Sequence, residues 1–71
     1  MFYEIENDIF SLDNIQRIHT SINSDKRYNN YGYANIDIYY KDGTWLKFRD
    51  LDPSIKINFL RKFREYSQKT A

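Results

Sequence analysis

The sequence predicts an α+β fold, a small antiparallel β-meander of four or five strands with one C-terminal α-helix packed on one face. Two observations carry this prediction. Apolar and polar residues alternate over residues 33–48 around Asp42-Gly43, which is typical of a β-hairpin. Apolar residues then recur at helical spacing after Asp52-Pro53. The 71 residues are expected to form a single domain, 1–71, with a marginal core and no disulfide, because the chain has no cysteine.

The N-terminal region predicts two short strands followed by a turn. Residues 2–6 alternate well enough for an edge strand, with Tyr3 and Ile5 on one face. Residues 9–12 form a second short apolar segment. Asp13 and Asn14 then favour a turn, because their side chains can bond their own backbone.

Residues 13–22 fit two kinds of element. Leu12, Ile15, Ile18 and Ile22 share one face of a helix. Ile18, Thr20 and Ile22 also alternate as residues of a strand do, and a segment this short is not decided by periodicity. The β-branched residues favour a strand, and a helix stays as the alternative.

The polar residues 23–32 predict a loop, long for so small a domain, and loops of this length are functional or mobile. It carries Lys26, Arg27, Tyr28 and Tyr31.

The register of the hairpin can be predicted from its pattern. A two-residue loop at Asp42-Gly43 would place Ile38 opposite Lys47. A three-residue loop, 41–43, instead pairs aliphatic with apolar residues, Ile38 with Leu46 and Ile36 with Phe48. Because a one-residue slip moves every side chain to the other face, we expect the three-residue loop, with Gly43 in the left-handed conformation.

This register gathers aromatic and polar side chains on the opposite face of the hairpin. Tyr39 is expected to pair with Trp45, Asp37 with Lys47, and Asn35 with Arg49.

The C-terminal helix is expected to begin with Asp52 as its cap and Pro53 in its first position. One stripe of the helix should face Ile36, Ile38, Leu46 and Phe48 of the hairpin; it contains Ile55, Phe59, Leu60, Phe63 and Tyr66. Ile57 lies on the outer side without an assigned partner. The basic residues Arg61, Lys62, Arg64 and Lys69 lie off the stripe.

The order of Leu12-Asp-Asn-Ile15, Ile18, Ile38-Tyr-Tyr-Lys-Asp-Gly43 and a closing helix resembles that of many short uncharacterised bacterial and phage proteins. These share a small antiparallel sheet followed by a helix, similar to a reduced pleckstrin-homology-type sheet. The resemblance covers most of the chain as a pattern. It implies a fold and no activity, cofactor or catalytic residue.

Several function classes are disfavoured by composition. No apolar run approaches the roughly 18 residues of a membrane span, and the first residues do not resemble a signal peptide, so we expect a cytoplasmic protein without a membrane partner. The single histidine, His19, excludes a two-histidine metal set within one chain and is interpreted as a surface residue rather than a general base. Gly32 and Gly43 cannot form a phosphate-binding loop. We predict a non-enzyme without cofactor or metal.

The aromatic face of the hairpin is the main functional signal, and three interpretations compete. The N-terminal strands or the loop could cover the rings, the rings could bind a protein or a second copy of the chain, or they could stack on single-stranded nucleic acid. We predict a protein-binding module that docks on and modulates a larger protein, such as a phage or mobile-element inhibitor. Its binding residues are predicted to be Tyr31, Tyr33, Tyr39, Trp45, Lys47 and Arg49.

The alternative is a nucleic-acid-binding module that uses the same aromatics and the basic helix face. Net charge is only +1, but residues 26–71 hold ten of the 11 lysines and arginines, an asymmetry that can indicate an anionic partner. The basic residues assigned to this alternative are Lys26, Arg27, Arg61, Lys62, Arg64 and Lys69. A solvated helix face explains the same charges without a ligand.

Overall fold

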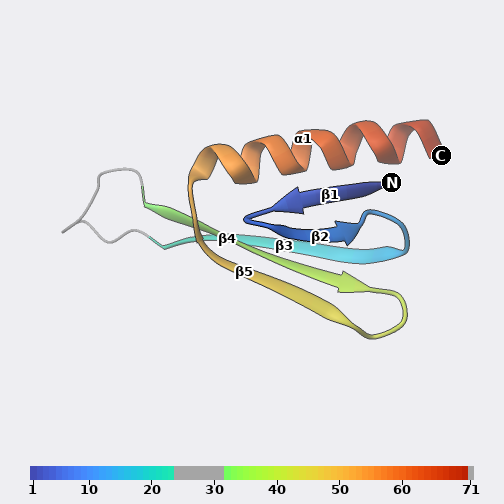
Figure 1. Cartoon of the computed structure of the whole chain (residues 1–71), viewed down its shortest axis with the longest axis horizontal. Helices are drawn as coiled ribbons and strands as arrows, with labels where there is room; N and C mark the ends of the chain where they lie inside the picture. Colours follow the sequence, from blue (N-terminus) through green and yellow to red (C-terminus); the bar gives the residue numbers. More distant parts are fainter. Residues whose placement is uncertain (24–31, 71) are drawn as a thin grey trace.

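The computed structural model describes residues 1–23 and 32–70 of the chain. Five strands precede one helix: β1 (Phe2–Ile5), β2 (Asp8–Ser11), β3 (Ile15–Asn23), β4 (Tyr33–Tyr40), β5 (Trp45–Leu51) and α1 (Pro53–Thr70) (Figure 1). The predicted α+β class, with antiparallel strands and one C-terminal helix, is confirmed. Lys26, Arg27, Tyr28 and Tyr31 lie outside the described residues.

The strands form two sheets rather than one continuous meander. β1 pairs with β2 in a two-stranded sheet, and β3, β4 and β5 form a separate three-stranded sheet in that order. Figure 1 shows the β1–β2 hairpin and α1 on the same side of the three-stranded sheet. The reason is burial: Ile5, Phe10 and Leu12 reach the common core only if the hairpin lies across the sheet face instead of extending its edge.

The β1–β2 hairpin closes through a two-residue turn. Ile5 pairs with Asp8, so Glu6 and Asn7 are the two loop residues, and both have positive φ, 49° and 72°. Positive φ at both central positions defines a type I′ turn, whose twist matches that of antiparallel strands.

Residues 15–23 are a strand, which decides between the two elements that the sequence allowed. Ile18 pairs with Ile38, Thr20 with Ile36 and Ile22 with Ala34. A β-bulge interrupts the ladder between Ile15 and Arg17.

The hairpin register is confirmed for four predicted pairs and differs at one. Tyr39 pairs with Trp45, Ile38 with Leu46, Asp37 with Lys47, and Ile36 with Phe48. The Tyr40 N–H donates to the Thr44 carbonyl at 2.9 Å and Gly43 has a φ of 92°, so the three-residue loop is present. Asn35 does not pair with Arg49, because a bulge follows Phe48 and the next ladder pair is Ala34 with Leu51.

Helix α1 begins as its sequence predicts. The Asp52 carboxylate accepts the backbone N–H of Ser54 at 2.9 Å, which makes Asp52 the N-cap. Backbone and side-chain hydrogen bonds from Ser54 lower the pKa of the Asp52 carboxyl.

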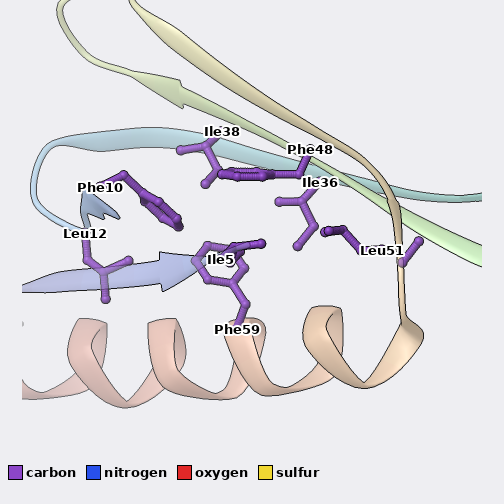
Figure 2. Close-up of a cluster of buried hydrophobic side chains, with 9 residues drawn as sticks. Ile5, Phe10, Leu12, Ile36, Ile38, Phe48, Leu51 and Phe59 are labelled. Atoms are coloured by element: carbon purple, nitrogen blue, oxygen red, sulfur yellow. The ribbon is translucent and has the colours of Figure 1, made fainter. Parts of the chain in front are cut away.

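The core lies between the three-stranded sheet on one side and the helix and β1–β2 hairpin on the other. Figure 2 shows Phe59 of α1 and Ile5 of β1 pointing toward Ile36, Ile38 and Phe48 of the sheet. The ring of Phe10 packs against the rings of Phe48 and Phe59, with centroids 5.5 Å and 5.9 Å apart. Four further residues that were predicted to pack between helix and hairpin also contact this core, at its partly buried margin; they are Leu46, Ile55, Leu60 and Phe63.

In residues 1–23 and 32–70, no helical stretch combines the length and apolar character needed to cross a bilayer.

Candidate functional site

The three-stranded sheet has a second face that points away from the core, which we call the open face. No other element of the described chain lies over it (Figure 1). Its side chains follow from the ladder pairs, because residues opposite each other in an antiparallel ladder share a face. The open face consists of Arg17, His19 and Ser21 of β3, Tyr33, Asn35, Asp37 and Tyr39 of β4, and Trp45 and Lys47 of β5. Arg49, in the bulge of β5, joins this face through its hydrogen bond to Asp37.

One end of the open face is a row formed by Arg17, Tyr39 and Trp45, one residue from each strand. The guanidinium carbon of Arg17 lies 4.5 Å from the centroid of the Tyr39 ring, a cation–π contact. Trp45 is 60 % exposed. Tyr39 is half-buried by its neighbours on both strands. The row therefore presents an accessible indole beside a phenol whose other side is fixed by arginine.

The bulge in β3 places Arg17 in this row. Ile15 pairs with Tyr40 and Arg17 pairs with Tyr39, so Gln16 is the extra residue. If Gln16 instead paired with Tyr39 in a regular ladder, Arg17 would fall opposite Ile38 on the core face. The bulge thus keeps Ile15 against the core and Arg17 against the Tyr39 ring.

The next row is centred on a carboxylate. Asp37 lies between His19 and Lys47 in the ladders, and its side chain is only 14 % exposed. Its Oδ1 accepts a hydrogen bond from Arg49 at 2.7 Å, and its Oδ2 lies 3.7 Å from the His19 Nδ1. Arg49 therefore forms an ion pair with Asp37 within the open face, and this carboxylate largely neutralises the charge of Arg49.

The row beyond Asp37, formed by Ser21 and Asn35, has a structural role. Asn35 is 5 % exposed; its amide donates to the Ser21 hydroxyl at 3.2 Å and accepts the Asp50 backbone N–H at 3.2 Å. Asp50 has a φ of 58°, at the bulge of β5. Asn35 thus holds the bulge through its side chain and is not available to a ligand.

The structure brings most of the predicted protein-binding residues together and separates the predicted nucleic-acid set from them. Tyr33, Tyr39, Trp45, Lys47 and Arg49 all belong to the open face. Tyr31 lies outside the described residues, as do Lys26 and Arg27. The basic helix residues are all exposed, but α1 packs on the other side of the sheet (Figure 1); they are Arg61, Lys62, Arg64 and Lys69. The helix cations and the aromatic rings therefore do not form one continuous surface.

The three β3 residues of the open face, Arg17, His19 and Ser21, are missing from the face that the sequence predicted. Their signal was present in the alternation of Ile18, Thr20 and Ile22, which places odd-numbered neighbours on the opposite face once β3 is a strand. The ambiguity between helix and strand concealed it.

The described residues hold no group of three or more histidine, cysteine, aspartate or glutamate side chains arranged to bind a metal ion. Every buried side-chain nitrogen or oxygen in the described part of the chain has a hydrogen-bond partner. The open face itself presents the exposed Trp45 ring and the cation–π pair of Arg17 and Tyr39.

Comparison of the chain with protein-family models, curated proteins and solved structures found no match.

Proposed function

We propose that this chain is a non-enzymatic protein-binding module that docks through the open face of its sheet on a larger protein and modulates it. A phage or mobile-element accessory protein that inhibits its target is one form of this function. The proposal extends to a second copy of the chain as the docking partner.

The observation that carries the proposal is the exposed Trp45 beside Tyr39 on a sheet face that no described element covers. Tryptophan, tyrosine and arginine are enriched among the residues that contribute most to protein–protein binding. Here all three lie in one row, with Arg17 on the far side of Tyr39. The row is carried by paired strands, so binding does not require a loop to become ordered, which lowers its entropic cost.

A photo-crosslinking experiment tests the proposal. A photoreactive phenylalanine derivative replaces Tyr39, and the crosslinked products in lysates of candidate host cells are identified by mass spectrometry. The same derivative at Ile57, which is exposed on the outer side of α1, is the matched control. We expect a protein adduct at position 39 that disappears when Trp45 is also changed to alanine and that is absent at position 57.

Self-association is measured in parallel by light scattering over a concentration series. A dimer that Trp45→Ala dissociates supports docking of the open face on a second copy. A monomer without any protein adduct at position 39 contradicts the proposed function.

Single-stranded nucleic acid is the second candidate, favoured by the cation–π pair of Arg17 and Tyr39 beside Trp45. Bases stack on aromatic side chains, and arginine adds to such contacts. Since the helix cations lie on the other side of the sheet, this candidate rests on the open face without them. Binding to oligothymidine or oligouridine that falls steeply with rising salt supports it.

A further inference from the structure

The geometry of the open face points to an acidic protein segment as its partner, with carboxylates placed on either side of an apolar contact. This inference rests on the proposed function and names the chemistry of the partner at the same face.

The charges of the open face are the first argument. It holds three basic side chains, Arg17, Lys47 and Arg49, against one carboxylate, Asp37. Arg49 and Asp37 neutralise each other through their 2.7 Å hydrogen bond. Neither Arg17 nor Lys47 has a carboxylate partner among the described residues, so these two cations can pair with the carboxylates of a ligand.

The positions of the two free cations define the arrangement of the ligand. Arg17 lies on β3 and Lys47 on β5, the two outer strands, with Tyr39 and Trp45 between or beside them. Adjacent strands are about 4.8 Å apart, and the two basic residues are also offset by two residues along the strands, about 6.6 Å, so the two basic positions are about 12 Å apart across the sheet. A complementary ligand therefore carries two anionic groups at about this separation, flanking an apolar or aromatic group that packs on Trp45.

A hollow beside Arg17 adds a place for one of these anionic groups. It is lined by Gln16, Arg17, Tyr39, Tyr40, Gly43 and Thr44, at the end of the sheet where the β4–β5 turn lies. A glutamate or aspartate side chain entering it can reach the Arg17 guanidinium, whose flat side is already held by the Tyr39 ring. Because that arginine is fixed in place, less side-chain freedom is lost when a carboxylate binds.

A protein segment fits this arrangement better than a nucleic-acid strand. Because Asp37 is paired with Arg49, the open face presents two separated cations among the described residues, Arg17 and Lys47. A strand of phosphates carries a charge at every step, which is more than two separated cations can neutralise. An extended peptide rises about 3.3 Å per residue and its side chains alternate between two faces, so acidic residues four positions apart lie on one face at about 13 Å and match the two cations.

Fluorescently labelled peptides provide the test, with anisotropy and backbone amide chemical shifts as readouts. The probe contains a central Glu-Ser-Phe-Ser-Glu segment, which places both glutamates and the phenylalanine on one face of an extended strand. Its comparison peptide has glutamine in place of both glutamates, and oligothymidine of similar length is the third ligand. We expect saturable binding of the glutamate peptide with shifts confined to the open face, and weaker binding of the glutamine peptide. An exposed ion pair predicts that Lys47→Gln and Arg17→Gln each weaken binding by about two- to five-fold. Lys62→Gln, the same change on the helix, should leave binding unchanged.

Equal binding of the glutamate and glutamine peptides overturns the inference, as does the absence of binding by both. Tighter binding of oligothymidine than of the glutamate peptide overturns it in favour of nucleic acid. These failures are distinct from failure of the proposed function, which depends on the Trp45-dependent protein adduct at position 39. An adduct whose crosslinked segment lacks acidic residues sustains protein docking and overturns the acidic partner alone.

Discussion

The Tyr40 hydroxyl donates a 2.6 Å hydrogen bond to the backbone carbonyl of Ser11, and this bond joins the two sheets of the fold. Tyr40 ends β4 in the three-stranded sheet and Ser11 ends β2 in the hairpin. The ring of Tyr40 packs at the edge of the core, so the bond is partly shielded from water. It contributes a directional restraint to an interface otherwise formed by apolar packing.

Removing this hydroxyl should destabilise the fold modestly. Tyr40→Phe keeps the ring and loses the bond, which is worth about 1 kcal/mol and corresponds to about 4–8 °C in melting temperature for a domain of this size. Circular dichroism melting curves measure the change. Tyr39→Phe is the matched control, because no hydrogen bond from the Tyr39 hydroxyl is present in the described structure. Equal losses for both variants would show that the Ser11 bond contributes nothing specific.

The same hydroxyl predicts a pH dependence at alkaline pH. Burial, and secondarily the charge of Asp42, raises the pKa of the Tyr40 phenol above its ordinary value of 10.0. The fold therefore favours the neutral phenol. This contribution is complete below pH 10 and is lost as pH rises through the folded pKa. The stability difference between wild type and Tyr40→Phe should shrink above pH 10 in denaturant titrations; a difference that grows there contradicts the assignment.

Asn35 is expected to be a structural residue despite its place on the face that binds. Asn35→Ala leaves the Asp50 N–H without its acceptor and should cost about 1–3 kcal/mol of unfolding free energy. Asn58→Ala, on the exposed surface of α1, removes a comparable side chain and should stay within about 0.5 kcal/mol of wild type. Chemical denaturation compares the two. If both variants are equally stable, the amide of Asn35 does not hold the β5 bulge.

The two bulges explain which parts of the fold were predictable from sequence. The β4–β5 register followed from alternation alone, because the pattern over residues 36–48 is uninterrupted. In β3, the extra residue Gln16 leaves the core-facing Ile15 and Ile18 three positions apart, a helical spacing. In β5, the bulge likewise separates the buried Phe48 and Leu51 by three positions. Periodicity carries no signal for an inserted residue, so the side chains beyond each bulge were the ones misplaced or missed.

The division of the strands into two sheets could not be predicted from the sequence, for a different reason. Alternation in residues 2–12 indicates which side chains are buried but not which surface buries them. Adding the hairpin to an edge and laying it across the sheet both satisfy that pattern. The choice depends on long-range packing of Ile5, Phe10 and Leu12 against Phe59, and no local pattern contains that information.

The turn between β1 and β2 should accept a stabilising double substitution. Glu6 and Asn7 both occupy left-handed backbone conformations, and the type I′ turn favours Asn followed by Gly. Glu6→Asn combined with Asn7→Gly should raise stability by about 0.5–2 kcal/mol, because Asn and Gly adopt the left-handed conformation at lower cost than Glu and Asn; the gain is read as a higher melting temperature. Replacing only Glu4 by Gln, on the adjacent strand, is a surface control. A lower melting temperature of the double variant would contradict the turn geometry.

The final prediction separates the proposed binding role of Trp45 from a role in folding. Trp45 is 60 % exposed and its main neighbour across the ladder is Tyr39, a kind of pair worth about 0.2–1 kcal/mol. Trp45→Ala should therefore remain folded, with a melting temperature lowered by only a few degrees, about 4–8 °C at most. Phe59→Ala is the contrasting variant: its ring is fully buried, and its loss should cost about 3–5 kcal/mol, much or all of the stability of so small a domain. Circular dichroism and amide NMR spectra measure both. If Trp45→Ala unfolds like Phe59→Ala, the indole belongs to the core, and any binding lost in that variant reflects unfolding rather than the open face.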